Sequence, residues 1–277
     1  MMNTEEFSMI LSSDTATGAT NVSADGSEFD VQLNEAIKIP DDALNCSLSV
    51  ESATVWWSVA NITTGVNDKL YMVGLDTSDV TQNFTLTIPQ GLYDLTALNL
   101  KIQQLLENQD GKISPYNNFD LIADNATQKV VIKFNYSVCE IDFSQSDTPR
   151  ELLGFASSNY GPYAGAPENV LAPNVAAFNS VDSFLIHCDL VDRGILLNNQ
   201  YSQVVSQVLI DVAPGSQIVN TPFNPTKIEA HNLIGASRRT IRVWLTDQAG
   251  NAVNTNGELY SLKIKISYSV PYVLTNR

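Results

Sequence analysis

Short runs of alternating apolar and polar residues near both ends of this chain constrain its fold more than any other feature. Successive side chains of a β-strand point to opposite faces, so this two-residue period predicts strands with one buried face. The runs are Phe29–Leu33, Cys46–Val50, Ala53–Val59, Phe184–Leu190, Val208–Val212, Ile228–Ala230, Ile241–Leu245 and Leu262–Val270. The outer segments, residues 28–62 and 178–277, therefore supply about seven or eight strands.

The phase of the alternation shifts by one residue inside the second of these strands. One apolar stripe ends at Val50, and the next begins at Ala53 and continues through Trp57. An extra residue in one strand of an antiparallel pair produces such a shift. We therefore predict a β-bulge near Glu51–Ser52 and place Trp57 in the core.

The middle of the chain, residues 63–177, has a different pattern. A short strand ends at Ile88, and a helix follows in which Asp94 is the expected N-cap and Gly111 the expected stop. The apolar face of this helix is formed by Leu95, Leu98, Ile102 and Leu105.

After the helix, the sequence predicts a hairpin over Phe119–Phe134 and a strand around Ile141. The capping box Thr148–Glu151 predicts a second, short helix that Gly154 ends. A loop rich in Gly, Pro, Ala and Asn, residues 156–177, closes the block. The simplest architecture is an antiparallel β-sandwich interrupted by a small inserted α+β domain.

Residues 1–27 are rich in Ser, Thr, Ala and Gly and show no clear period. We expect an N-terminal arm that has no regular structure of its own and gains order against a neighbouring subunit.

Composition excludes several functions. The net charge of −15 opposes binding to a phosphate backbone, so no nucleic-acid partner is expected. The basic residues Arg238, Arg239, Arg242, Lys263 and Lys265 are interpreted as exposed strand faces. Neither a signal peptide nor an apolar run long enough for a transmembrane segment is present. Cys46, Cys139 and Cys188 are expected to be reduced thiols, and Cys46 and Cys188 to be buried.

No catalytic, cofactor-binding or metal-binding residue is predicted, and the chain is not expected to be an enzyme. His187 and His231 are far apart, and each is interpreted as a surface or interface histidine. The acid pairs Asp41–Asp42 and Asp189 with Asp192 are expected by chance among 30 acids. Trp56 and Trp244 are interpreted as sheet-face contacts and not as a sugar-stacking platform.

Four segments resemble penton and related minor capsid proteins of virophages and Polinton-type elements. The first, FTLTIPQGLYDLTALNLKIQQLLEN (84–108), is similar to their strand, Ile-Pro-x-Gly-x-Tyr and amphipathic helix. Leu153-Gly154-Phe155 and the C-terminal IRVWLTDQAGNAVNTNGELYSLKIKISY match later parts of the same pattern. The stretch ALNCSLSVESATVWWSVANI occupies the place of their Trp-bearing strand. The chain departs from the family at its end, PYVLTNR, where a basic or aromatic motif is expected.

The resemblance implies a jelly roll with an inserted domain, which forms a homopentamer at icosahedral five-fold vertices beside the major capsid protein. The implied location is the virion, assembled inside the host cell. Two alternatives stay open: a short double jelly-roll major capsid protein that forms trimers, and a carbohydrate-binding or adhesin sandwich. A hydrolase is a more distant fourth reading.

Overall fold

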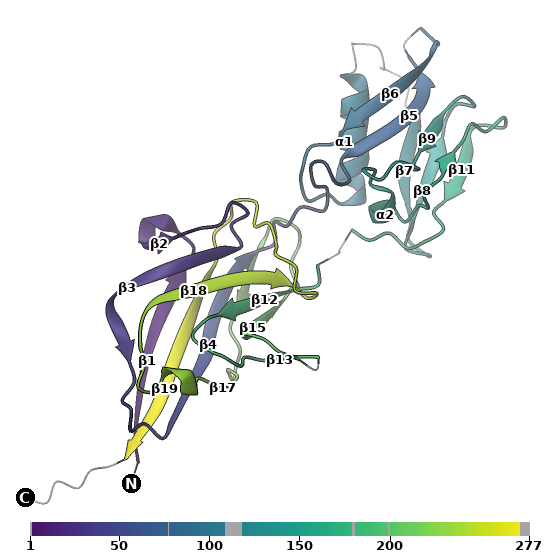
Figure 1. Cartoon of the computed structure of the whole chain (residues 1–277). Helices are drawn as coiled ribbons and strands as arrows, with labels where there is room; N and C mark the ends of the chain where they lie inside the picture. The colour runs from purple at the N-terminus through teal and green to yellow at the C-terminus, as the bar shows by residue number, and fades with distance from the viewer. Residues whose placement is uncertain (1, 77, 109–117, 179–180, 199, 272–277) are drawn as a thin grey trace, which may run out of the picture. The chain divides into compact units, whose positions relative to one another are not determined.

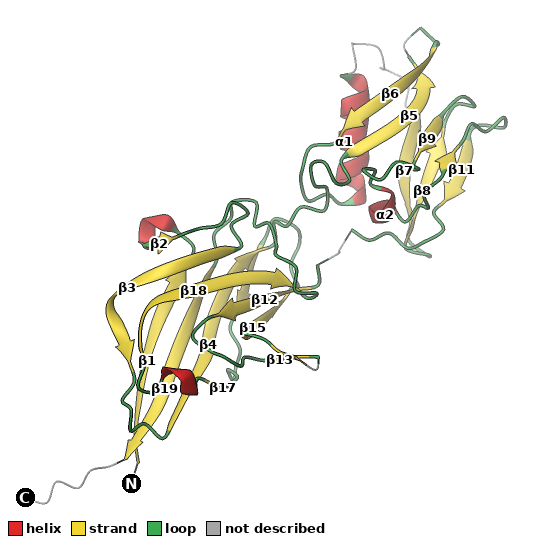
Figure 2. Ribbon diagram, in the orientation of Figure 1, coloured by secondary structure: helices red, strands yellow, loops and turns green. Residues whose placement is uncertain are grey.

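The computed structural model describes residues 2–76, 78–108, 118–178, 181–198 and 200–271, and it is mainly β (Figures 1 and 2). The chain divides into two compact units. Unit 1 comprises residues 1–59 and 181–277, and unit 2 comprises residues 60–180.

Unit 1 consists of two antiparallel sheets. The first has the order β1-β19-β4-β16, with β17 also paired to β4, and the second has the order β15-β12-β18-β3-β2. Their strands are β1 (Met2–Ser12), β2 (Ala19–Thr20), β3 (Glu28–Lys38), β4 (Asn45–Trp56), β12 (Ser183–Cys188), β15 (Val204–Leu209), β16 (Gln217–Asn220), β17 (Ile228–Glu229), β18 (Ser237–Asp247) and β19 (Ser261–Pro271). A separate hairpin, β13 (Leu196–Leu197) with β14 (Gln200–Tyr201), joins β12 to β15, and 3-10 turns span Thr15–Thr17 and His231–Leu233.

The order in which the chain fills these sheets defines the fold. Apart from the two-residue strands, β1, β4, β16 and β19 lie in the first sheet, and β3, β12, β15 and β18 lie in the second. The chain crosses between sheets at every step except from β12 to β15. Eight strands distributed in this way over two facing antiparallel sheets form a jelly roll. The predicted jelly-roll sandwich is confirmed.

The N-terminal segment corrects one expectation. Residues 2–12 are not an arm but the first strand of the jelly roll, paired along their whole length with β19. Phe7, Met9 and Leu11 lie opposite Ile266, Ile264 and Leu262, and Leu11 is buried. These three apolar residues alternate with Glu6, Ser8 and Ile10, and the exposed Ile10 obscures the period in the sequence.

The predicted bulge in β4 is confirmed. Ser52 lies opposite Lys263 and Val50 opposite Ile264, so Glu51 is the extra residue. The bulge keeps both Val50 and Ala53 in the core, where Trp57 is also buried.

Unit 2 contains two small antiparallel sheets and two helices. The strand orders are β10-β9-β5-β6 and β11-β8-β7. The elements are β5 (Lys69–Leu75), β6 (Thr81–Thr87), α1 (Leu95–Glu107), β7 (Phe119–Asp124), β8 (Lys129–Phe134), β9 (Glu140–Asp142), α2 (Arg150–Leu153), β10 (Asn159–Tyr160) and β11 (Glu168–Leu171). Leu98, Ile102 and Leu106 of α1 pack into a core made of unit 2 residues alone.

The helix ends agree with the sequence in part. Asp94 caps α1 by accepting a hydrogen bond from the backbone N–H of Ala97 at 2.6 Å, whereas Gly111 lies outside the described residues. The capping box at Thr148 is wrong, because its hydroxyl donates to the carbonyl of Gln145 instead and α2 begins at Arg150. Gly154 ends α2 in the left-handed region at φ +80°, where a Cβ would lie 2.4 Å from the Asn174 carbonyl oxygen.

Candidate assembly surface

His187 is buried within the single chain. Its ring lies on the outward face of β12 and stacks on Trp244 of β18, with ring centroids 4.9 Å apart and an interplanar angle of 12°. Its Nε2 lies 2.9 Å from the hydroxyl of Thr246, and the residue is 8% exposed. Burial lowers the pKa of His187 to about 4. The side chain is therefore a neutral part of the sheet face at pH 7.

His231 is a surface histidine, as predicted, and its Nδ1 lies 3.9 Å from the carboxylate of Glu229. The three cysteines are free and buried, and burial raises the pKa of Cys46 and Cys139 to about 11 and that of Cys188 to about 12. Within the described residues, no group of three or more His, Cys, Asp or Glu side chains could hold a metal ion, and no helix is long and apolar enough to cross a membrane.

The acid pairs do not form an enclosed site. The Asp189 carboxylate accepts a hydrogen bond from the backbone N–H of Arg242 at 2.9 Å, and burial raises its pKa. Asp192 is exposed and lines an open cavity of about 320 Å³ with Glu229 and His231. Acid–base chemistry on a substrate needs an enclosed, desolvated pocket. The half-buried Asp189 and the exposed Asp192 do not line one.

The tryptophans do not form a common platform. Trp244 is half-buried on the outward face of the second sheet. Trp56 is half-buried beside Gln217 on the outward face of the first sheet. The two rings lie on opposite faces of the sandwich, so they cannot stack on one sugar chain. This placement disfavours the carbohydrate-binding alternative.

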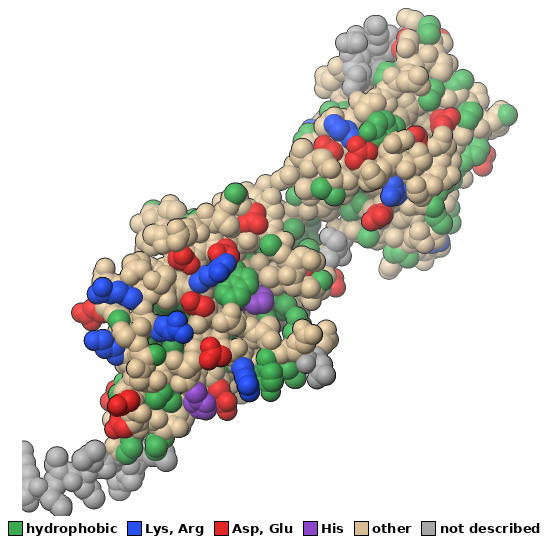
Figure 3. Space-filling model, in the orientation of Figure 1, with side chains coloured by type: hydrophobic (Ala, Val, Ile, Leu, Met, Phe, Trp, Pro, Cys, Tyr) green, Lys and Arg blue, Asp and Glu red, His purple; other side chains and the backbone are tan. Residues whose placement is uncertain are grey.

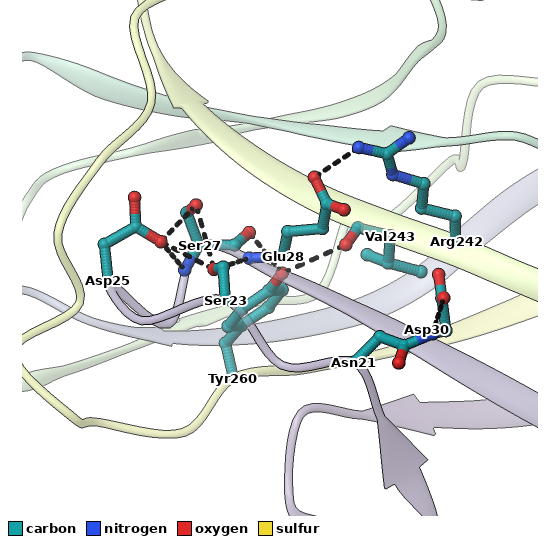
Figure 4. A network of polar contacts seen from close by, with 9 residues as sticks. All are labelled: Asn21, Ser23, Asp25, Ser27, Glu28, Asp30, Arg242, Val243 and Tyr260. Carbon is teal, nitrogen blue, oxygen red and sulfur yellow. Dashed lines mark hydrogen bonds and ion pairs between the residues drawn. The ribbon is translucent and has the colours of Figure 1, made fainter.

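A network of polar contacts fixes the loop that leads into β3 (Figure 4). The buried Tyr260 hydroxyl donates to the Ser27 carbonyl at 2.7 Å, and the Tyr260 ring packs edge-on against Phe29. Asp25 accepts hydrogen bonds from the hydroxyls of Ser23 and Ser27. Burial raises the pKa of Asp25, but these hydrogen bonds outweigh it and hold the pKa below its usual value. The network is structural: it holds this loop in place and, through the Glu28–Arg242 ion pair, links β3 to β18.

Exposed apolar side chains gather at one edge of the jelly roll, where β15 ends the second sheet and β16 ends the first. The edge carries Leu196, Tyr201, Leu209, Val219 and Phe223. These are five of the nine exposed large apolar side chains in the described part of unit 1. Figure 3 shows apolar side chains beside the β13–β14 hairpin at this edge. We call this surface the β15–β16 edge.

A gap in the strand beside β4 opens a cavity in the β15–β16 edge. The strand pairs with β4 through β16 and again through β17, and residues 221–227 between them leave the ladder. Pro222 and Pro225 lie in this loop and lack the N–H that a ladder requires. The resulting cavity of about 280 Å³ is lined by Val50, Ile195, Val205, Ser206, Gln207, Asn220, Pro222 and Thr226.

Phe223 projects from the same loop. Its side chain is fully exposed, at 107% relative to an extended reference, and Pro222 and Pro225 restrict the backbone on either side. Phe223 was not among the residues predicted from the sequence, although an aromatic residue between two prolines in a turn is a visible signal. Phe223 therefore adds a large apolar side chain to the exposed apolar residues of the β15–β16 edge.

The fold and this edge define a class of protein: a jelly roll with an inserted α+β unit, an apolar open edge, and no enclosed reactive pocket among the described residues. A search with protein-family models finds no match, and a search of curated proteins finds none either. Among solved structures, the chain is similar to the mavirus penton protein, with 10% sequence identity and a TM-score of 0.46. That match covers 96% of this chain and 100% of the penton chain.

Proposed function

We propose that this chain is a structural virion protein, a penton that forms a homopentamer at the five-fold vertices of an icosahedral capsid. The observation that carries the proposal is the β15–β16 edge. A monomer leaves Phe223 and four other large apolar side chains of this edge in water, and each would be worth roughly 1.5–3 kcal/mol when buried. Contact with further subunits would recover part of that free energy.

The pattern of residues 84–108, similar to that of virophage pentons, supports the same function. The low content of charged residues, 16%, also suits a surface that is desolvated against other subunits. The partners in this proposal are further copies of the chain and the major capsid protein. Nucleic acid is not a partner, because the net charge of −15 repels phosphate.

The trimeric major capsid alternative needs two jelly rolls in each chain. Residues 60–180 would have to contain the second one. The described residues of that unit instead form a four-stranded sheet, a three-stranded sheet and one long helix. A pentameric vertex protein requires only the jelly roll of unit 1.

Native mass spectrometry of the purified full-length chain tests the proposal. We expect a species near five times the chain mass of 30.3 kDa. Electron microscopy of particles assembled with the major capsid protein should then place it on five-fold axes. A chain that stays monomeric at high concentration and does not enter particles would contradict the proposal, and a species near three chain masses would favour the trimer.

A further inference from the structure

The side of the jelly roll opposite the β15–β16 edge is also open. In the first sheet, β1 lies at the end opposite β16. In the second sheet, β2 lies at the end opposite β15. We call this side the β1–β2 edge. The two edges share no strand, so they can contact two different neighbours at once.

β1 is the longest open strand edge in unit 1. It has 11 residues, against six in β15, four in β16 and two in β2. Natural proteins protect edge strands by shortening them, by proline, by bulges or by charged side chains, because an open edge pairs readily with another chain. Of these, β1 has only the charges of Glu5 and Glu6, near its start. The pairing of β1 with β19 contains no bulge, and β1 contains no proline.

The register identifies which backbone groups face outward. The N–H of Ser13 donates to the carbonyl of Tyr260, so Ser13 belongs to a hydrogen-bonded pair of the ladder. In an antiparallel ladder these pairs alternate, so the even-numbered residues from Thr4 to Ser12 turn their N–H and C=O groups toward the free edge. Ile10 is one of them, and its side chain is 71% exposed.

The charges of the two edges are complementary. Residues 1–37 contain seven acidic and no basic side chains. On β1 itself, Glu6 is held by Lys265 and Ser267 of β19, and Glu5 accepts from the Tyr268 hydroxyl.

The β15–β16 edge carries Arg193, which lies over the Tyr201 ring at 5.2 Å, and Lys227 beside the cavity loop. Arg193 forms no ion pair within the described residues. Ser267 and Lys265 lower the pKa of Glu6, and Lys227 of the same chain already lies close enough to add a smaller effect. Two β1–β2 edges brought together would instead repel each other.

We infer that the β1–β2 edge of one copy of this chain docks on the β15–β16 edge of the next copy. Ile10 of the first copy would enter the apolar surface around Phe223, and the acidic β1–β2 edge would approach Arg193. A contact between two different patches is heterologous, and it closes into a ring when the rotation between copies permits. The inference rests on the proposed function, because it names the contact that would build the pentamer.

Two single variants test the contact. Ile10→Asp places a charge on the β1–β2 edge, and Phe223→Asp places one on the β15–β16 edge. We expect each to be monomeric by native mass spectrometry at concentrations where the wild type is a ring. Leu100→Asp, at an exposed position of helix α1 in unit 2, is the matched control and should keep the ring.

Mixing the two variants separates this contact from a symmetric one. Each variant retains the edge that the other has lost, so the mixture should form 1:1 heterodimers and no rings. Rings that persist in both variants, or homodimers formed by either variant alone, would overturn the inference and leave the pentamer proposal standing. A monomeric wild type would overturn both.

A second β1 variant covers the case in which Ile10→Asp impairs folding. Ser8→Pro removes an N–H that faces the free edge and leaves the ladder with β19 intact. It should lower ring formation at least tenfold while its thermal unfolding stays cooperative. A folded Ser8→Pro variant that assembles like the wild type would show that β1 is not the docking strand.

Discussion

His187 gives the folded chain a pH dependence that can be measured directly. Its pKa falls from 6.5 to about 4 on folding, because the buried ring resists protonation. Between these pH values the unfolded state binds a proton that the folded state does not, so stability falls as the pH drops. Between pH 7 and 4.5, the wild type should lose about 2 kcal/mol more than His187→Gln.

Urea unfolding at the two pH values measures this difference. Glutamine can still form a hydrogen bond with the Thr246 hydroxyl but does not titrate. The comparison therefore separates the effect of protonation on stability from the effect of losing that hydrogen bond. Equal losses in the two proteins would mean that the ring is accessible to protons in the folded state.

Single residues were predictable where the period of a strand decides their environment. Cys46 and Trp57 are buried because each is in phase with an apolar stripe. His187 is out of phase, and its burial depends on Trp244 and Thr246, which lie almost 60 residues away in the sequence. Phe223 follows no period at all, so only the three-dimensional structure connects it with the rest of the β15–β16 edge.

Tyr260 links the loop before β3 to the segment before β19. We expect its hydroxyl to contribute to the free energy of unfolding in addition to the packing of its ring. The hydroxyl satisfies the Ser27 carbonyl in a buried position at the entrance to β3 (Figure 4). Tyr260→Phe keeps the packing against Phe29 but removes one of the two donors to that carbonyl, which still accepts from the Leu245 N–H at 2.8 Å. It should cost about 1 kcal/mol of unfolding free energy, the net worth of one hydrogen bond. Tyr201→Phe, at an exposed position, should cost almost nothing in the same urea experiment. Equal values for the two variants would contradict this role.

At the level of elements, the bulge at Glu51 was visible because a phase slip inside one continuous run has few other causes. β1 was missed because Ser, Thr and Glu interrupt its apolar residues, and because its regularity comes from pairing with β19 at the other end of the chain. The capping box at Thr148 failed for a related reason. The local sequence is compatible with a capping box, but the Thr148 hydroxyl donates to the Gln145 carbonyl instead.

For the whole molecule, the sequence supported a sandwich with an insertion, because a helix and a hairpin stand between two strand-rich segments. The order of the strands could not be predicted from the sequence. The apolar period of a strand identifies its buried face but not the strands that pair with it. The order matters for function. It places β1 at one side of the jelly roll and β15 and β16 at the other, which makes a head-to-tail contact between copies available.

Removing unit 2 tests this organisation. Residues 60–180 have their own buried core, so the jelly roll should not need them in order to fold. In the shortened chain, a linker of about ten Gly and Ser residues replaces them and spans roughly 17 Å. We expect this chain to fold and to unfold cooperatively. Both edges belong to unit 1, so the shortened chain should also assemble into rings by native mass spectrometry. Adding Phe223→Asp to it should abolish those rings. A shortened chain that folds but stays monomeric would assign the subunit contact to unit 2, and one that does not fold would show that the two cores depend on each other.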